Sequence, residues 1–157
     1  MIDFIYTCNM NKIEHLGIAV KDASASIKLF ELLLGVSPYK TESVESEKVE
    51  TIFFQLGPNK IELLRSTDPD GTIAKFLDKK GEGFHHVAIA VDDIHSEMKR
   101  LANAGFELLM QEPKKGADNK LICFLHPRST NGLLVELCQE ISAWLKSTIF
   151  QIQNNYI

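Results

Sequence analysis

The amino-acid sequence predicts an α+β fold in which two tandem βαβββ modules form one domain. Two stretches, at residues 13–20 and 84–91, alternate between larger apolar residues and small or polar ones, as half-buried β-strands do. Each is followed by an aspartate and then by apolar residues at helical spacing. The two stretches also match, because "HLGIAVKD" lies over "HVAIAVDD" with an offset of 71 residues. Near the end of each half, "KIELL" lies over "LVELC" with an offset of 74, which indicates a tandem duplication.

Length and composition are those of an ordinary globular chain. The 157 residues are 45% hydrophobic and 24% charged, which is enough to bury a core without cross-links. A net charge of −4 argues against a broad nucleic-acid surface, and no apolar run approaches the roughly 18 residues of a membrane span. Three widely spaced cysteines and an N-terminus without a basic segment argue against a disulfide framework and a signal peptide. We therefore expect a cytoplasmic protein that binds neither nucleic acid nor membranes.

The first module is expected at residues 12–67, after an N-terminal extension at residues 1–11. Its first strand is "IEHLGIAV", and Asp22 is a suitable N-cap for the helix that follows. Gly35 fits the position that ends this helix. Two strand-like stretches, "VETIFFQLG" and "KIELLR", then complete the module.

The second module is expected at residues 83–139, after a linker with a short helix at residues 68–82. The strand "FHHVAIAV" is followed by a helix that Asp93 caps and Gly105 ends. Then come "FELLMQE", the loop "PKKGADN", the strand "KLICFLHP", the turn "RSTNG" and "LLVELCQ". Residues 140–157 have apolar residues at helical spacing and are expected to form a helical tail that packs on the body or on a second subunit.

Each module places one histidine on its first strand and one glutamate on its last. They are His15 and Glu62 in the first module, and His86 and Glu136 in the second, with sequence separations of 47 and 50 residues. Each histidine shares a strand face with small residues, which leave room beside it. Buried carboxylates need partners, and two of them beside two imidazoles suit a divalent cation such as cobalt, zinc, nickel or manganese. The repeat therefore predicts a metal site formed by both modules.

The other histidines have simpler interpretations. A lone histidine on a strand is usually a satisfied core or surface group, and His85 has the opposite strand parity to His86, so we expect a structural role for it. His95 lies on the second module's helix and is expected to be solvated. His126 lies where a strand enters a turn, which favours a loop role and leaves a role at the edge of a cleft open.

The tandem pattern with its His…Glu…His…Glu order resembles the vicinal oxygen chelate superfamily, the glyoxalase and bleomycin-resistance-like fold. Within it, "IEHLGIAVKD", "KIELL", "GEGFHHVAIAVDDI", "QEPKKGA" and "FLHPRSTNGLLVEL" are similar to the methylmalonyl-CoA epimerases, over residues 12–139. The resemblance implies that the family's metal ligands carry over to His15, Glu62, His86 and Glu136. Some epimerases have glutamine at the second of these positions, whereas lactoylglutathione lyases have glutamate in a similar context.

The resemblance also implies a reaction, namely a metal-assisted 1,1-proton transfer at C2 that interconverts (R)- and (S)-methylmalonyl-CoA. The metal would chelate the thioester carbonyl and carboxylate oxygens of this acyl-CoA and stabilise the charge left when the C2 proton departs. Inversion needs two acid–base groups, and Glu136 is the candidate for one of them. Some relatives carry the other, a glutamate, at the position that aligns with Thr51. Either a bulge turns the adjacent Glu50 inwards, or another group or water delivers the second proton.

The anionic tail of a CoA or glutathione thioester requires basic side chains nearby. Lys114, Lys115 and Arg128 lie in the two loops of the second module and are candidates, although solvated loop charges are an equally good interpretation. The paired modules and the apolar tail favour a homodimer. Two other functions stay open: a lactoylglutathione lyase or another metal-dependent isomerase or lyase of the superfamily, and a non-catalytic module that binds a small ligand. The complete ligand set argues against the last of these.

Overall fold

The structure is a computed structural model, and it describes residues 10–141. Two βαβββ repeats follow each other in this range, with one helix between them. The first repeat consists of β1 (Met10–Ala19), α1 (Ala23–Leu34), β2 (Lys40–Val44), β3 (Val49–Leu56) and β4 (Asn59–Ser66), followed by the linker helix α2 (Thr72–Lys80). The second repeat consists of β5 (Gly83–Val91), α3 (Ile94–Asn103), β6 (Lys114–Lys115), β7 (Lys120–Leu125) and β8 (Val135–Glu140). The predicted α+β fold of tandem βαβββ modules is confirmed.

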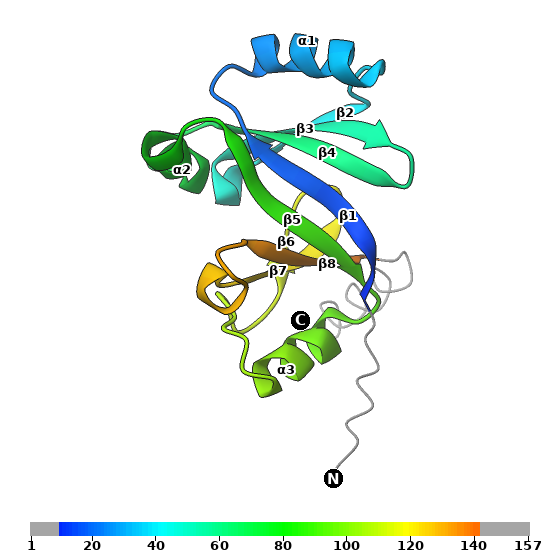
Figure 1. Cartoon of the computed structure of the whole chain (residues 1–157), viewed down its shortest axis with the longest axis vertical. Helices are drawn as coiled ribbons and strands as arrows, with labels where there is room; N and C mark the ends of the chain where they lie inside the picture. The colour runs from blue at the N-terminus through cyan, green and yellow to red at the C-terminus, as the bar shows by residue number, and fades with distance from the viewer. Residues whose placement is uncertain (1–9, 142–157) are drawn as a thin grey trace, which may run out of the picture.

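The strands of residues 10–141 form one mixed sheet of eight strands in the order β2-β3-β4-β1-β5-β8-β7-β6. The two repeats join edge to edge, because β1 pairs with β5 in antiparallel fashion. Within each repeat the first and last strands are parallel neighbours, β1 with β4 and β5 with β8. The sheet curls into a half-barrel, so that the inner faces of the two halves turn towards each other (Figure 1).

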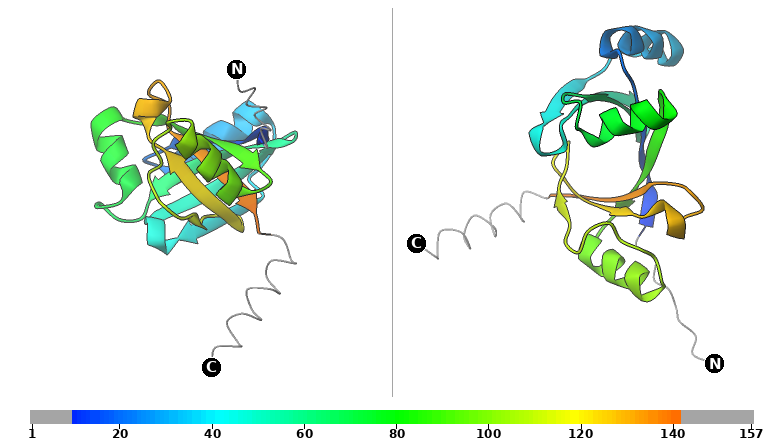
Figure 2. Two further views of the ribbon diagram at one scale, coloured as in Figure 1. Left: turned by 90° about the horizontal axis from the view of Figure 1, so that it is seen from below. Right: turned by 90° about the vertical axis from the view of Figure 1, so that its left-hand side faces the viewer.

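The helices α1 and α3 cover the outer faces of the two halves (Figures 1 and 2). Below α1, the buried residues Ile52, Phe54 and Leu63 contact apolar side chains of the helix, and α3 contributes Ile94, Met98 and Leu101 to a second core. Burying each such side chain contributes roughly 1.5–3 kcal/mol to the free energy of folding, which holds α1 and α3 against the outer faces of the sheet. The inner faces are therefore left for a site.

Both predicted helix caps are confirmed. The Asp22 carboxylate accepts a hydrogen bond from the Ala25 backbone N–H at 3.0 Å, and the Asp93 carboxylate accepts one from the Ser96 backbone N–H at 3.1 Å. These bonds satisfy donors that have no partner inside the first turn of a helix. Each cap starts its helix directly after the first strand of its repeat.

The second repeat departs from the prediction at its second strand. The two residues of β6, Lys114 and Lys115, lie inside the stretch "PKKGADN" that we expected to be a loop. The preceding stretch "FELLMQE" contributes one isolated bridge, between Leu108 and Leu125. Pro113 lacks the N–H group that a regular ladder needs, which explains why pairing is interrupted here.

The ends of the chain also differ from the predicted boundaries. Strand β1 begins at Met10, inside the predicted N-terminal extension at residues 1–11. Residues 1–9 of that extension, and residues 142–157 of the predicted tail, lie outside the described residues. Among the helices of residues 10–141, none is long and apolar enough to cross a membrane.

A loop of the second repeat reaches the first repeat. We call residues 116–119, which join β6 to β7, the crossing loop. Its Asp118 carboxylate accepts hydrogen bonds from Lys40 Nζ at 3.1 Å and from Lys60 Nζ at 2.7 Å. Just before the loop, Lys114 Nζ lies 2.5 Å from Glu47 Oε1. These ion pairs connect the two halves at a second place, away from the β1–β5 ladder.

Candidate metal centre

The inner face of the curled sheet lines a cavity of about 280 Å³ to which both repeats contribute. Its lining combines apolar side chains from the strands and α2 with a group of polar and titratable ones. The polar and titratable lining residues are His15, Glu47, Thr51, Glu62, Thr72, His85, His86, Lys114, Lys120 and Glu136. The cavity thus contains all four predicted metal ligands.

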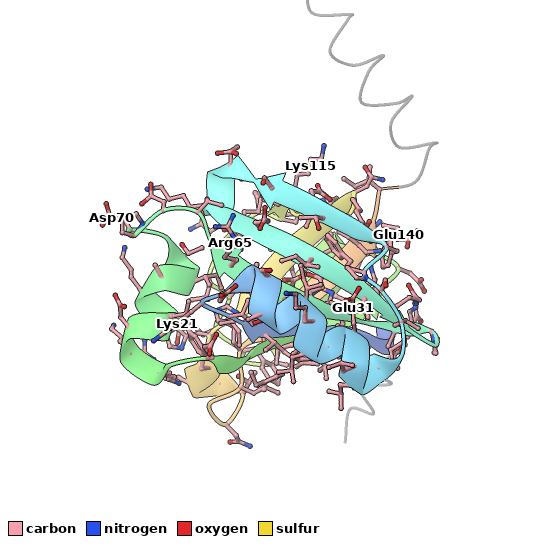
Figure 3. All side chains as sticks on the ribbon, turned by 90° about the horizontal axis from the view of Figure 1, so that it is seen from above. Lys21, Glu31, Arg65, Asp70, Lys115 and Glu140 are labelled. Atoms are coloured by element: carbon pink, nitrogen blue, oxygen red, sulfur yellow. The ribbon has the colours of Figure 1, made fainter. Side chains whose placement is uncertain are left out.

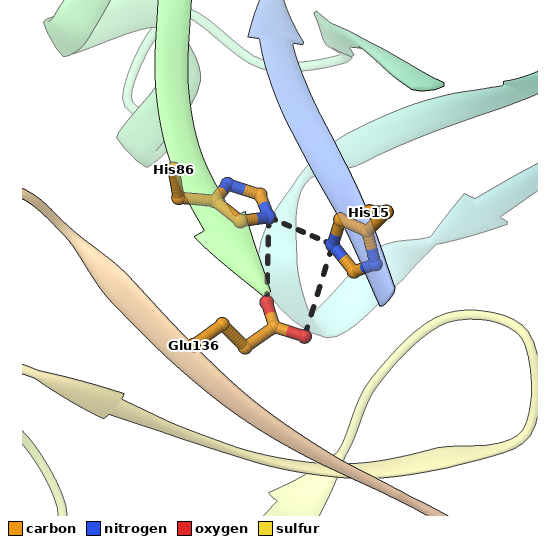
Figure 4. Close-up of side chains that lie close together, drawn as sticks. All are labelled: His15, His86 and Glu136. Carbon is orange, nitrogen blue, oxygen red and sulfur yellow. Dashed lines mark hydrogen bonds and ion pairs between the residues drawn. The ribbon is translucent and has the colours of Figure 1, made fainter. Parts of the chain in front are cut away.

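Three of these ligands converge on one point (Figure 4). The Nε2 atoms of His15 and His86 lie 2.9 Å apart. The carboxylate of Glu136 approaches both, with its Oε2 3.5 Å from His86 Nε2 and its Oε1 3.9 Å from His15 Nε2. All three side chains are buried, and each offers one ligand atom within 4.8 Å of the others.

The fourth predicted ligand, Glu62, lies on the other side of the His15 ring. Its Oε1 is 3.3 Å from His15 Nδ1. Glu62 forms a second group with Glu14 and His15, again with ligand atoms within 4.8 Å of one another. The four predicted ligands therefore form two overlapping groups that share His15, rather than one ring of four donors around a point.

The strand register explains why the four side chains meet. Gly17 of β1 is the neighbour of Glu62 on β4 and of His86 on β5. In the second repeat, Ala88 is the neighbour of His15 on β1 and of Glu136 on β8. One small residue in each repeat thus lies beside the histidine of the other repeat and the glutamate of its own.

Two register shifts place further polar residues beside the two histidines. The ladder between β1 and β5 shifts between Ile13 and His15, so that Glu14 is an extra residue on β1. It shifts again where Gly17 pairs with His86 and Ile18 with Phe84, so that His85 is an extra residue on β5. Extra residues of this kind disturb the alternation of strand faces.

Sequence reasoning missed the consequences of both shifts. The expectation that His85 faces away from His86 is wrong, because His85 lines the same cavity and its Nδ1 lies 2.9 Å from His86 Nδ1. Glu14 was not predicted as a site residue, yet it is buried and its Oε2 lies 2.5 Å from His15 Nδ1. The available signal was the repeat itself, since Glu14 and His85 are separated by the same 71 residues as the two histidines that follow them.

Burial controls the protonation of the candidate ligands. It raises the pKa of Glu136 to about 8, and it also raises the pKa of Glu62. It lowers the pKa of His86 well below its ordinary value, and the neighbouring His15 adds to this effect. Burial alone would lower the pKa of His15, but the carboxylates around it outweigh burial and raise it.

The donor set fits a divalent cation. Two imidazoles and two carboxylates are common ligands of first-row metal ions, and the ionised forms of buried carboxylates are costly without a partner. A bound cation would favour these ionised forms and would take the place of protons in the cavity.

Behind the ligands lies a buried charge network around Glu14. Its Oε1 lies 2.5 Å from Lys60 Nζ and 3.4 Å from Lys120 Nζ. Burial would raise the pKa of Glu14, but hydrogen bonds from His15 and Lys60 outweigh burial and lower the pKa to about 2. Glu14 is therefore ionised at neutral pH and joins β1, β4 and β7.

The structure corrects the prediction for Glu50. Strand β3 pairs with β2 and β4 without interruption, so there is no bulge to turn Glu50 inwards. Its Oε2 instead accepts a hydrogen bond from Arg65 Nε at 2.9 Å. The buried Thr51 lines the cavity in its place.

The candidate basic residues for substrate binding are not equivalent. Lys114 lines the cavity, whereas Lys115 is exposed and projects from the surface (Figure 3). The side chain of Arg128 is 76% exposed, and its nearest ion-pair partner, Glu107, is 3.4 Å away. The structure thus brings one of the three to the site.

The remaining histidines behave as expected. His95 is exposed, and its nearest carboxylate, that of Glu112, is 3.8 Å away. The Nδ1 of His126 accepts a hydrogen bond from the Arg128 backbone N–H at 3.0 Å and so caps the short turn Pro127–Ser129. Neither residue lines the cavity.

The fold and the paired His–Glu arrangement define a recognised class of protein. Residues 14–124 match the family model of the Glyoxalase/Bleomycin resistance protein/Dioxygenase superfamily, and the chain belongs to this superfamily.

The relatives of this chain within the superfamily include named epimerases. It is 36% identical over 132 residues to the mitochondrial methylmalonyl-CoA epimerase of Homo sapiens, covering 83% of this chain and 75% of that one. It is 38% identical over 130 residues to the uncharacterized protein YqjC of Bacillus subtilis, covering 83% of this chain and 93% of YqjC. Among solved structures, the methylmalonyl-CoA epimerase of Mycobacterium tuberculosis superposes with a TM-score of 0.84 at 27% identity, covering 92% of this chain and 97% of that one. Homology therefore supports an enzyme of the isomerase kind.

Proposed function

We propose that this protein is a metal-dependent methylmalonyl-CoA epimerase that interconverts the (R) and (S) forms by moving a proton at C2. One observation carries the proposal: His15, His86 and Glu136, from both repeats, place their ligand atoms together inside one cavity. The names of the relatives direct this chemistry to methylmalonyl-CoA.

In this proposal His15, His86 and Glu136 hold a divalent cation such as cobalt, zinc, nickel or manganese, and Glu62 would complete the ligand set by turning its carboxylate from the Nδ1 side of the His15 ring towards the same centre. When bound, the cation supplies electrostatic stabilisation of the negative charge that develops on the thioester oxygen as C2 loses its proton. Glu136 is also the candidate acid–base group on one face of C2. Burial raises the pKa of this carboxylate to about 8, which supports a role in proton transfer.

The second proton transfer, on the opposite face of C2, needs a group other than Glu50. Of the carboxylates that line the cavity, Glu47 lies outside the proposed ligand set. Its ion pair with Lys114 Nζ places it beside the one candidate basic residue that reaches the cavity. In our proposal either Glu47 or a water molecule exchanges the second proton, and Lys114 contributes to binding the anionic substrate.

Lys115 and Arg128 remain proposed contacts for the phosphates of the CoA tail, which extends beyond the cavity. An acyl-CoA thioester as the small-molecule partner is supported by relatives that carry it in their names. A homodimer and a cytoplasmic location remain predictions from the sequence.

A substrate comparison tests the proposal. The cobalt-reconstituted protein is mixed with a single epimer of methylmalonyl-CoA and, separately, with the hemithioacetal of glutathione and methylglyoxal. We expect the protein to convert the single epimer into a mixture of the (R) and (S) forms. His86→Ala should lose this conversion, whereas the exposed control His95→Ala should keep it.

Turnover of the hemithioacetal alone would replace the proposal with a lactoylglutathione lyase. Cobalt binding with turnover of neither substrate would favour a non-catalytic binding module.

A further inference from the structure

We infer that His85 is a positioning residue, which accepts a hydrogen bond from Nδ1 of His86 and thereby directs Nε2 of His86 to the metal centre. The inference rests on the proposed metal site, which it deepens by adding a residue that contacts a ligand rather than the cation.

The geometry places His85 directly behind His86 as seen from the centre. The two Nδ1 atoms lie 2.9 Å apart, and the two rings are nearly perpendicular, with an interplanar angle of 85°. On its far side, Nε2 of His86 faces Nε2 of His15 at 2.9 Å. The His86 ring therefore has one nitrogen against His85 and the other against the candidate metal centre.

The ring of His86 is in contact with the rings of both His15 and His85. Only one assignment of their protons leaves the Nε2 lone pairs of both His15 and His86 available to a cation. His15 carries its proton on Nδ1 and donates it to Glu14, whose oxygen lies 2.5 Å away. His86 must then carry its proton on Nδ1 and donate it to the Nδ1 lone pair of His85. A partner on the second ring nitrogen commonly fixes a metal-binding histidine in this way.

The same arrangement occurs in both repeats. Glu14 and His85 are each the extra residue at a register shift in the β1–β5 ladder, and each contacts Nδ1 of the following histidine. The shift turns a residue that would otherwise face outwards towards its neighbour's ring. Glu14 and His85 differ chemically, but both contact Nδ1 of the histidine that follows them. The two repeats therefore share this contact rather than the type of residue that makes it.

His85 is held in place by the linker helix. Its ring packs edge to face against Phe76 of α2, with ring centroids 4.8 Å apart and an interplanar angle of 79°. Phe76 in turn packs against the buried residues Leu77 and Ile73 and their neighbours on the sheet. The position of the His85 ring is thus set by the core, which a positioning residue requires.

The experiment is a calorimetric titration of the metal-free full-length protein with Co²⁺. The decisive pair is His85→Leu, which keeps bulk but removes the acceptor, and His85→Asn, whose Oδ1 can accept near the position of Nδ1. We expect His85→Leu to bind Co²⁺ roughly 10–100-fold more weakly than the unsubstituted protein. His85→Asn should bind it almost as tightly as the unsubstituted protein.

His95→Leu, which makes the same change at an exposed histidine, controls for the loss of an imidazole elsewhere, and far-UV circular dichroism checks that each variant is folded. In the zinc-loaded protein, the ¹⁵N shifts of His86 should show the proton on Nδ1. Equal Co²⁺ affinity of His85→Leu and the unsubstituted protein would overturn the inference and leave the metal site intact. If the unsubstituted protein binds no Co²⁺, the proposed function fails first.

Discussion

At the scale of the residue, the site depends on the size of the residue that neighbours each candidate histidine ligand on the adjacent strand. Gly17 lies beside the ring of His86 so closely that a Cβ atom at this position would be 2.3 Å from Cε1 and 2.5 Å from Nδ1. The equivalent residue in the second repeat, Ala88, faces His15 and has a methyl group in its place. The ring of His86 therefore occupies space that only a glycine at position 17 provides.

This close approach predicts the effect of Gly17→Ala. The new methyl group must displace the His86 ring, since contacts under 3.0 Å do not occur between real Cβ atoms and their neighbours. We expect a folded protein with Co²⁺ affinity reduced by about tenfold or more, as for the loss of a residue that orients a ligand. Calorimetric titration measures the Co²⁺ affinity, and Ala88→Gly, which creates no clash, is the matched control. Unchanged affinity in Gly17→Ala would show that His86 is not a ligand in the position described.

Glu14 provides a pH dependence of stability. Its pKa is lowered from 4.5 to about 2 in the folded protein, chiefly because hydrogen bonds from His15 and Lys60 outweigh burial. A lowered pKa means that the folded state binds fewer protons, so the contribution is complete above pH 4.5 and is lost as the pH falls towards 2. The shift corresponds to a contribution on the order of 3 kcal/mol.

Urea unfolding of the metal-free protein between pH 6 and pH 2 measures this contribution. We expect Glu14→Gln to be less stable at pH 6 and to lose less of its remaining stability on acidification. Parallel pH profiles for Glu14→Gln and the unsubstituted protein would contradict the role assigned to Glu14.

At the scale of the element, the strands and caps could be predicted from local signals, whereas the bulges could not. Alternation of apolar residues located β1 and β5, and an aspartate after each strand located the helix starts. Glu14 and His85 enter the site because of how β1 pairs with β5, and this pairing is between residues far apart in the chain. A one-residue shift reverses the face of a side chain, so alternation alone assigned His85 to the wrong face.

Whether Glu50 could act as the second base also depended on how strands far apart in the sequence pair. The sequence alone left open a bulge that would turn Glu50 into the cavity, and continuous pairing of β3 with both neighbours excludes it. The crossing loop was likewise invisible in the sequence, because its partners Lys40 and Lys60 belong to the other repeat.

The crossing loop leads to a prediction for Asp118→Asn. The substitution removes a charge that two lysines share, while asparagine tolerates the positive φ of 51° at this position. We expect the free energy of unfolding to fall by about 1 kcal/mol, since the ion pairs are partly exposed. Amide hydrogen exchange in residues 116–119 should become faster. Asp70→Asn in an exposed turn is the control, and unchanged exchange in the crossing loop would contradict its anchoring role.

At the scale of the whole molecule, duplication explains the cavity. Each repeat contributes one histidine and one glutamate from neighbouring parallel strands, and the β1–β5 ladder brings the two pairs together. The helices α1 and α3 cover the outer faces of the sheet, and the inward curl of the sheet leaves a cavity lined by buried donors. A single repeat would hold only half of the proposed ligand set.

Solvent deuterium exchange at C2 of methylmalonyl-CoA tests the proposed proton transfer most directly. The cobalt-reconstituted protein is incubated with the substrate in D₂O, and mass spectrometry follows the gain of one deuterium at C2. We predict deuterium incorporation well above that of a metal-free sample. His86→Ala should incorporate no more deuterium than the metal-free sample. No incorporation by a protein that has demonstrably bound cobalt would contradict the account.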